Sequence, residues 1–321
     1  MEAAPEPTAK PTAAPTAKPT AEPKVEPPKP VEPPTLADIK RPAAPQELEA
    51  AGKALAEKKW QGCIDALDAK KDVIVQAAID IRVRALTMRG LAQVMLEDPK
   101  KAVIQYRKVL NYFGTAAKKL EGQIGKKDEA AFNKRLEAMN SSFAEALFYL
   151  AEEKRAKAAA IELAPYDGPA EAPKVKKHFD IKVAQWVRLR QRAVDRAAKE
   201  YGKLESLKPS PPAAWGVAAA GRVALMRAGF ADALAANKAP EDWAKAAPAP
   251  APTAADGGAP APAENPGKLA FEQFKTSLDA ALEPLMTQAR EAFQKCDEQA
   301  SADVKDDASA KYCKGWLEGH K

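Results

Sequence analysis

The chain contains 321 residues with a formal net charge of +6 at pH 7, and 28 of them are proline. No run of about 18 apolar residues occurs, which excludes a membrane-spanning helix. Outside the proline-rich stretches the chain is rich in alanine, leucine, lysine, glutamate and arginine, and only 6% of all residues are aromatic. Because these residue types favour helices, we expect an all-α protein.

Two stretches contain too few large apolar residues to form a core. Residues 1–45 and 246–267 consist mainly of proline, alanine and small polar residues. Burying so little apolar surface does not offset the entropy of ordering, so we expect a disordered tether at 1–45 and a disordered insertion at 246–267. In polyproline II form the tether would reach roughly 140 Å, although a passive spacer is the alternative.

Helical periodicity and capping residues predict the elements between these stretches. In residues 46–125 we expect antiparallel pairs built from helices at 46–59, 60–70, 72–97 and 99–114. In residues 126–245 we expect a helix pair at 128–160 with a break near 140–142, a long helix at 175–204 and a small-residue helix at 213–236. In residues 268–321 we expect a hairpin of a helix at 269–300 and a short helix ending near Trp316. Gly216 and Gly221 predict that a neighbouring helix approaches the small-residue helix closely.

The long predicted helix carries an apolar stripe and a basic stripe. The apolar stripe, interrupted only by Arg190, consists of Val175, Phe179, Val183, Trp186 or Val187, Val194, Ala198 and Tyr201. The basic stripe consists of Arg188, Arg192 and Arg196, spaced four residues apart. It fits a partner with a regular row of anions, or it is a solvated face paired with neighbouring carboxylates. Nucleic acid is disfavoured, because no aromatic residues for base stacking alternate with the arginines.

Two helix pairs in residues 46–125 share one pattern. Ala51, Cys63, Leu67 and Lys70 have the same mutual spacing as Gly90, Ala102, Tyr106 and Val109, and Gly90 follows Ala51 by 39 residues. The small residues stand where two packed helices approach closely. This steric demand explains the pattern without catalysis, so we interpret these positions as repeat-packing residues.

The pattern resembles the tetratricopeptide repeat, with Gly90, Ala102 and Tyr106 at the small, small and aromatic signature positions. The first unit departs from it at Cys63 and Leu67, and the offset exceeds the family's repeat of about 34 residues. The resemblance implies a solenoid of stacked helix pairs whose groove binds protein partners. Gln105 and Tyr106 are candidate partner-binding residues of that groove.

The later helices are similar to the long helical region of tetratricopeptide-repeat proteins from bacterial envelopes, including those of gliding-motility machinery. The marks of this resemblance are Trp215 with the Ala/Gly-rich helix after it, the LEPL segment at 282–285 and the two late cysteines. The stretch at 246–267 departs from it. The resemblance implies protein partners in an envelope complex.

Cys296 and Cys313 fall in the two predicted helices of the C-terminal hairpin, whereas Cys63 lies alone in an early helix. A hairpin can bring the late pair within disulfide reach, which would favour an oxidising compartment such as the periplasm. Two unpaired thiols on helix faces are the alternative.

Residues that carry common chemistry are scarce. Histidine occurs only at positions 178 and 320, and neither stands at ligand spacing to another donor. The chain has no phosphate-binding glycine loop, no Gly-x-Ser-x-Gly elbow and no Cys-x-x-Cys pair. We therefore expect no enzyme activity, no cofactor and no metal site.

These observations support three functional hypotheses. The first is a non-catalytic scaffold for protein–protein interaction in a periplasmic or other envelope machine of gliding motility or envelope transport. The second is a binding module for anionic wall polymer or lipid headgroups that uses the basic stripe. The third is a cytoplasmic helical-repeat adaptor. The segment MEAAPEPTAK has no hydrophobic stretch of signal-peptide type, but a chain whose signal or lipid anchor was removed would look the same.

Overall fold

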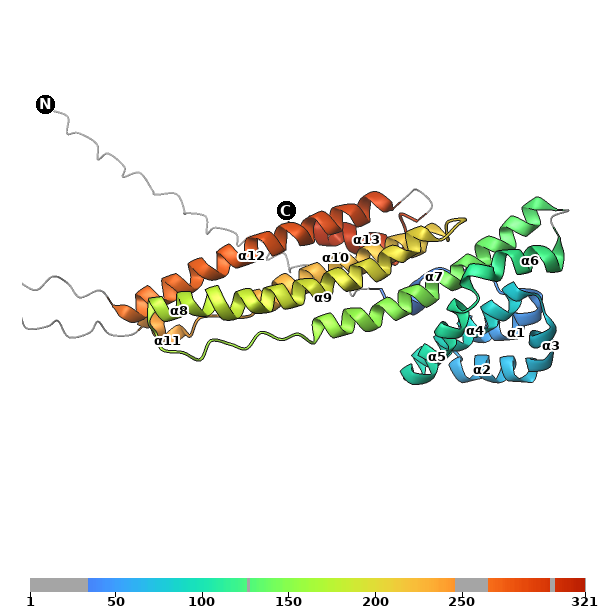
Figure 1. Cartoon of the computed structure of the whole chain (residues 1–321), viewed down its shortest axis with the longest axis horizontal. Coiled ribbons are helices and arrows are strands. Elements are labelled where there is room, and N and C mark those ends of the chain that lie inside the picture. Colours follow the sequence, from blue (N-terminus) through green and yellow to red (C-terminus); the bar gives the residue numbers. More distant parts are fainter. Residues whose placement is uncertain (1–33, 126–127, 246–264, 301–303, 321) are drawn as a thin grey trace, which may run out of the picture. The chain divides into compact units, whose positions relative to one another are not determined.

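A computed structural model describes residues 34–125, 128–245, 265–300 and 304–320. Every regular element in these ranges is helical, and none of them contains a strand. The α-helices, shown in Figure 1, are α1 (Glu49–Ala56), α2 (Trp60–Ala69), α3 (Lys71–Gln76), α4 (Ile79–Met95), α5 (Pro99–Leu110), α6 (Ala116–Ile124), α7 (Glu129–Ala159), α8 (Ala172–His178), α9 (Ala184–Gly202), α10 (Ala213–Ala235), α11 (Glu241–Lys245), α12 (Pro266–Gln299) and α13 (Ala308–Gly319). The expectation of an all-α protein is confirmed for the described residues.

Short 3-10 and π turns complete the architecture. The 3-10 turns are Leu36–Asp38, Gln46–Leu48, Phe113–Thr115 and Lys203–Ser206. A π turn, Phe179–Val183, joins α8 directly to α9, so the long helix predicted at 175–204 is continuous. It begins slightly earlier than predicted, at Ala172, because Pro173 occupies its first turn.

The helix predicted at 72–97 is divided into α3 and α4. Ala77 is extended, and Ala78 is the N-cap of α4. The free backbone N–H of Ile79 donates to Gln123 Oε1 at 2.8 Å, so a side chain from α6 satisfies the start of α4. The prediction of one helix was wrong, because this tertiary partner leaves no trace in local periodicity.

The break predicted near 140–142 is also wrong, because α7 runs without interruption through these polar residues. Asn140 and Ser141 are buried and bond to other elements. The Asn140 amide donates to the Pro209 carbonyl at 2.5 Å, and the Trp215 indole N–H donates to Ser141 Oγ at 2.9 Å. These polar side chains therefore connect α7 to α10 and the segment before it, and do not end the helix.

Helix α7 contacts α4 and α5 as well as the later helices α9 and α10, as Figure 1 shows. Arg135 binds Asp80 of α4 through two hydrogen bonds of 2.7 Å. Further along α7, Phe148 packs edge-on against Tyr201 of α9 and Trp215 of α10. One core consequently extends from α4 and α5 through α7 to α9 and α10.

Two details of the later helices differ from the predictions. In α9, Ala197 is buried where Ala198 was expected. In α10, a Cβ on Gly221 would lie 3.4 Å from Cys313 Sγ, so a neighbour does approach there, whereas a Cβ on Gly216 would meet nothing within 4 Å. Close approach therefore explains Gly221 but not Gly216.

The expectation of disorder over 1–45 and 246–267 falls largely outside the described residues, but it is wrong at both inner ends. Leu36 and Ile39 are buried, and α12 already begins at Pro266. At the second of these ends, the Asn265 side chain caps α12 by accepting from the N–H groups of Gly267 and Lys268. Composition alone did not reveal these local anchors.

Candidate functional site

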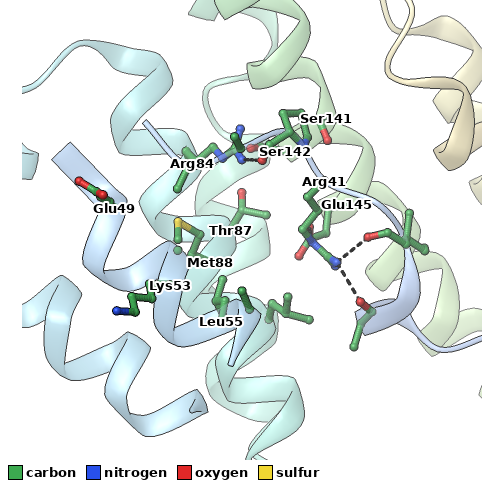
Figure 2. A pocket seen from close by; sticks show the side chains of 18 of the residues that line it. Arg41, Glu49, Lys53, Leu55, Arg84, Thr87, Met88, Ser141, Ser142 and Glu145 are labelled. Atoms are coloured by element: carbon green, nitrogen blue, oxygen red, sulfur yellow. Dashed lines mark hydrogen bonds and ion pairs between the residues drawn. The ribbon is translucent and has the colours of Figure 1, made fainter. Parts of the chain in front are cut away.

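A cavity of about 650 Å³ is lined mainly by three helices and an irregular segment, together with Trp60 of α2. The helices are α1, α4 and α7, of which α1 and α4 are the first helices of the hairpins α1–α2 and α4–α5. The segment is Thr35–Pro45, which we call the strap. Figure 2 shows the side chains of all four elements around this space.

The strap is fixed by a buried carboxylate. Arg41 Nε donates to Glu145 Oε2 at 2.6 Å, and the Glu145 side chain is only 2% exposed. The Tyr106 hydroxyl donates to the other carboxylate oxygen at 2.9 Å. Desolvation and the negative charge of Glu145 hold the pKa of Tyr106 well above its usual value. Tyr106 therefore stays a neutral donor, and Glu145 receives one ionic and one neutral hydrogen bond.

Arg84 of α4 holds the same segment from another side. Its guanidinium donates to the Pro42 carbonyl of the strap. Burial lowers the pKa of Arg84, because the charged form loses solvation. Arg84, Arg41 and the buried Glu145 all lie at the cavity wall, which also includes Glu49 and Lys53 of α1.

The repeat-packing positions occupy equivalent places in two hairpins. Ala51, Cys63, Leu67, Ala102, Tyr106 and Val109 are buried, and a Cβ on Gly90 would lie 3.0 Å from the Tyr106 ring. Lys70 is exposed at the C-cap of α2, so it departs from the pattern. The small-to-aromatic contact at Gly90 and Tyr106 therefore joins α4 to α5.

The turns of the two hairpins have the same backbone conformation. Lys58 and Glu97, which are 39 residues apart, both have φ near 57°. The Lys58 N–H donates to the Leu55 carbonyl and the Glu97 N–H donates to the Val94 carbonyl, each at 3.0 Å. This equivalence has the same 39-residue offset as the sequence pattern, so the two α1–α2 and α4–α5 pairs are alike in their turns as well as in their packing.

The two residues expected to bind a partner in the groove do not lie on an open surface there. Tyr106 is fully buried, and its hydroxyl is engaged by Glu145. Gln105 is half-buried on α5 and does not line the cavity. The prediction that Tyr106 contacts a partner was wrong, because its ring fills the space left by Gly90. Glu145 and Arg41 were not predicted; the sequence signal for Glu145 was one acid within the apolar run FAEALF.

The basic stripe is exposed on α9. Arg188, Arg192 and Arg196 all face solvent, and no carboxylate in the described ranges forms an ion pair with them. The two nearby acids are engaged elsewhere: Asp195 accepts from Gln191 at 2.8 Å, and Glu200 pairs with Lys203. The stripe therefore presents three uncompensated positive charges.

Arg190, on the opposite side of α9, has a structural position. It is 8% exposed, and it donates to the carbonyls of Ile161 and Gly229 at 3.2 and 3.1 Å. Its guanidinium stacks near the rings of Trp186 and Phe230. Arg190, which interrupts the apolar stripe, therefore connects α9 to the loop after α7 and to α10.

A second cavity of about 580 Å³ lies between α9, α10 and α12. Gly216 and several alanines form its wall, and Arg227, which donates to Gln288 Oε1 at 2.7 Å, lies at its polar edge. Gly216 therefore borders a cavity, and no neighbouring atom requires a glycine there.

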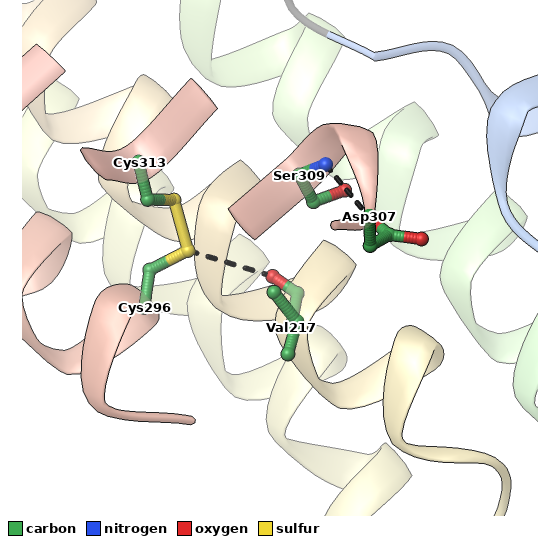
Figure 3. The surroundings of a disulfide bond; sticks show 5 residues. All are labelled: Val217, Cys296, Asp307, Ser309 and Cys313. Carbon is green, nitrogen blue, oxygen red and sulfur yellow. Dashed lines mark hydrogen bonds between the residues drawn. A yellow bond between two sulfur atoms is a disulfide. The ribbon is translucent and has the colours of Figure 1, made fainter. Parts of the chain in front are cut away.

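Cys296 and Cys313 form a disulfide that links α12 to α13, as Figure 3 shows. Both residues are fully buried. The Cys296 sulfur lies 3.7 Å from the Val217 carbonyl oxygen of α10, and because a disulfide sulfur carries no proton this is a packing contact. Cys63 is a free, buried cysteine, and burial raises the pKa of its thiol to about 11.

These environments predict a simple thiol titration. Native protein purified without reductant should show no reactive thiol at pH 8, because Cys63 is buried and protonated. After denaturation, one thiol of the three cysteines should react. Three reactive thiols in denaturant would contradict the Cys296–Cys313 bond.

His178 lies in an aromatic cluster at α8, with its ring 4.9 Å from Tyr166 and 5.9 Å from Phe179. Burial lowers the pKa of His178 below its usual value of 6.5. Neutral, buried His178 contributes to the free energy of unfolding. This contribution is complete above pH 6.5 and is lost as the pH falls through the folded-state pKa, because the unfolded chain binds the proton more readily. We predict that urea midpoints fall less between pH 7.5 and 5 in His178→Phe than in wild type. An equal pH dependence in His178→Phe and wild type would contradict this assignment.

The described residues contain no group of three or more histidine, cysteine, aspartate or glutamate side chains suited to a metal ion. In the same ranges, no helix combines the length and apolarity needed to cross a membrane. No protein-family model, curated protein or solved structure matches the chain.

Proposed function

We propose that this chain is a non-catalytic scaffold of the tetratricopeptide-repeat type that binds protein partners in a bacterial envelope machine. The observation that carries the proposal is the equivalence of the α1–α2 and α4–α5 hairpins, which share packing positions and turn conformation at an offset of 39 residues. Stacked helix pairs of this kind form concave surfaces that bind partners. The 650 Å³ cavity along α1 and α4 supplies such a surface.

The envelope location rests on a separate observation. The Cys296–Cys313 disulfide suits an oxidising compartment such as the periplasm. A cytoplasmic adaptor, the alternative location, would keep these thiols reduced, so free-thiol counting of the protein isolated from its natural source separates the two.

The basic stripe supports a second candidate function, which is binding of anionic wall polymer or lipid headgroups. Arg188, Arg192 and Arg196 are exposed without counter-charges in the described ranges. Exposed charges of this kind bind polyanions with strong salt dependence, because their field is screened over about 8 Å at physiological ionic strength.

Retention of envelope components on the immobilised full chain tests both functions. Trp60 lines the cavity and is half-buried, which suits an aromatic contact for a protein partner. For a scaffold, Trp60→Ala should reduce retention of a protein at least tenfold, with modest dependence on salt, whereas Arg192→Glu should have little effect.

For polymer or lipid binding, the same two variants should give the reverse pattern. Arg192→Glu should abolish retention, and wild-type binding should weaken steeply between 0.05 and about 0.5 M salt. Circular dichroism must show that both variants keep their helical content. Retention that neither substitution changes would contradict both proposals.

A further inference from the structure

The strap, Thr35–Pro45, is held on the helices as a bound peptide would be. It begins with a single 3-10 turn, Leu36–Asp38, in which the Thr35 backbone N–H and hydroxyl both donate to the Asp38 carboxylate. These hydrogen bonds lower the pKa of Asp38 and stabilise the turn. From Ile39 to Pro45 the chain is irregular, so the strap belongs to none of the helices that it crosses.

The anchors of the strap come from residues far away in the sequence. Leu36 and Ile39 insert as apolar side chains, 8% and 4% exposed. Arg41 pairs with Glu145, and its guanidinium lies 5.6 Å from the centre of the Trp215 ring. The remaining donors of Arg41 bind the carbonyls of Leu36 and Ile39 at 2.8 Å, so the strap is folded around its own arginine.

Arginines of the helices bind the backbone of the strap and of the residue before it. Arg222 of α10 donates to the Pro34 carbonyl at 2.5 Å, and Arg84 of α4 donates to the Pro42 carbonyl. The strap is therefore held by side-chain hydrogen bonds to main-chain carbonyl groups and by burial of two apolar side chains. Both kinds of contact are available to a peptide that is not part of the chain.

The crossing at α1 leaves room for nothing larger than glycine. A Cβ on Gly52 would lie 2.4 Å from Ala44 Cβ of the strap and 3.7 Å from Met88 Cε. Replacing Gly52 with alanine would thus displace the strap, while the other neighbours accept the methyl group. The cavity of about 650 Å³ lies beside this crossing, between the strap and the helices. The strap therefore leaves part of the helix surface uncovered.

We propose that the surface formed by α1, α4, α7 and α10 is a binding site for a peptide with the strap's own chemistry and conformation, and that the strap is its built-in competitor. The recognised chemistry is two apolar side chains three residues apart, followed two residues later by an arginine that reaches Glu145. This inference rests on the proposed scaffold function and specifies its partner. A tethered competitor has an effective concentration on the order of millimolar, so it reduces the apparent affinity of a peptide in solution.

The test measures binding of a fluorescent peptide with the sequence TLADIKRP to the full chain by anisotropy. This peptide keeps the anchors Leu36, Ile39 and Arg41 but ends before Ala44, so alanine at position 52 blocks the strap and not the peptide. Gly52→Ala, with the strap displaced, should bind at least tenfold more tightly than wild type. The matched control is Gly122→Ala in α6, where an added Cβ meets nothing within 4 Å, and it should behave as wild type. A peptide in which alanine replaces the arginine should not bind any of the three proteins. Equal binding by folded Gly52→Ala and wild type would overturn the proposal.

A second measurement decides the matter if Gly52→Ala does not fold. A protease site is placed at the exposed residues Gln46 and Glu47 and is cut after folding. The released segment should dissociate and rebind reversibly while the helical signal is retained. Loss of the helical signal on dissociation would show that the strap is an integral part of the fold, and would overturn the proposal. Neither assay contains an envelope partner, so their failure leaves the retention experiments on the scaffold untouched.

Discussion

Replacement of Trp215 with alanine is expected to lower the free energy of unfolding by about 4 kcal/mol, the largest effect of any single substitution considered for this chain. Trp215 is fully buried on α10 and packs edge-on against Phe148 of α7. Its indole N–H donates to Ser141, and the Arg41 guanidinium of the strap lies over its ring. The substitution therefore removes contacts to α7 and to the strap together.

Urea unfolding followed by circular dichroism measures this effect, and two further variants locate its source. Trp215→Phe keeps a ring for Phe148 and loses the hydrogen bond to Ser141. The free energy of unfolding should fall by about 1 kcal/mol for the lost hydrogen bond, and by a further amount because the smaller ring makes fewer contacts. Trp316→Ala, at a half-buried tryptophan on α13, should cost less than Trp215→Ala. A loss below about 1 kcal/mol for Trp215→Ala would contradict the packing of α10 on α7.

Removal of the disulfide is expected to have the second largest effect, about 3 kcal/mol, from the loop that a sequence separation of 17 residues closes. The bond fixes the short helix α13, which packs against α10 and α12. The double variant Cys296→Ala and Cys313→Ala avoids leaving a buried thiol or hydroxyl beside Gly221. Its free energy of unfolding should equal that of reduced wild type.

Reductant provides the internal control for this second prediction. Wild-type stability should fall when dithiothreitol is added, whereas the stability of the double variant should not change. A double variant as stable as oxidised wild type would show that α13 does not depend on the bond. Sensitivity of the double variant to reductant would point to another source, because the remaining Cys63 is unpaired.

Much of the helical organisation could be predicted from local signals. Asp98 caps α5, accepting from the Lys101 N–H, and Pro99 occupies its first position, as the EDPKK segment indicates. The small-residue helix α10 begins after Pro212 and ends at Ala235, close to the predicted 213–236. Such boundaries were accessible because caps and prolines act within one turn.

Features set by tertiary contact could not be predicted in the same way. Asn140 and Ser141 look like a helix end in sequence, and only their partners at Pro209 and Trp215 show why α7 continues. The strap was missed because proline-rich composition dominates residues 1–45, although Leu36, Ile39 and Arg41 stand out in it as anchors. The partner of Arg41 lies 104 residues away, beyond the reach of any local pattern.

The central claim is that a protein partner binds the surface along α1 and α4, and site-specific photo-crosslinking tests it most directly. A photoreactive amino acid is placed at Lys53, an exposed residue at the cavity, and in separate samples at Arg192 on the basic stripe and at exposed Glu283 on α12. The scaffold account predicts a discrete protein adduct from position 53 in envelope extract and none from position 283. Absence of a protein adduct at position 53, or equal adducts at positions 53 and 283, would contradict it.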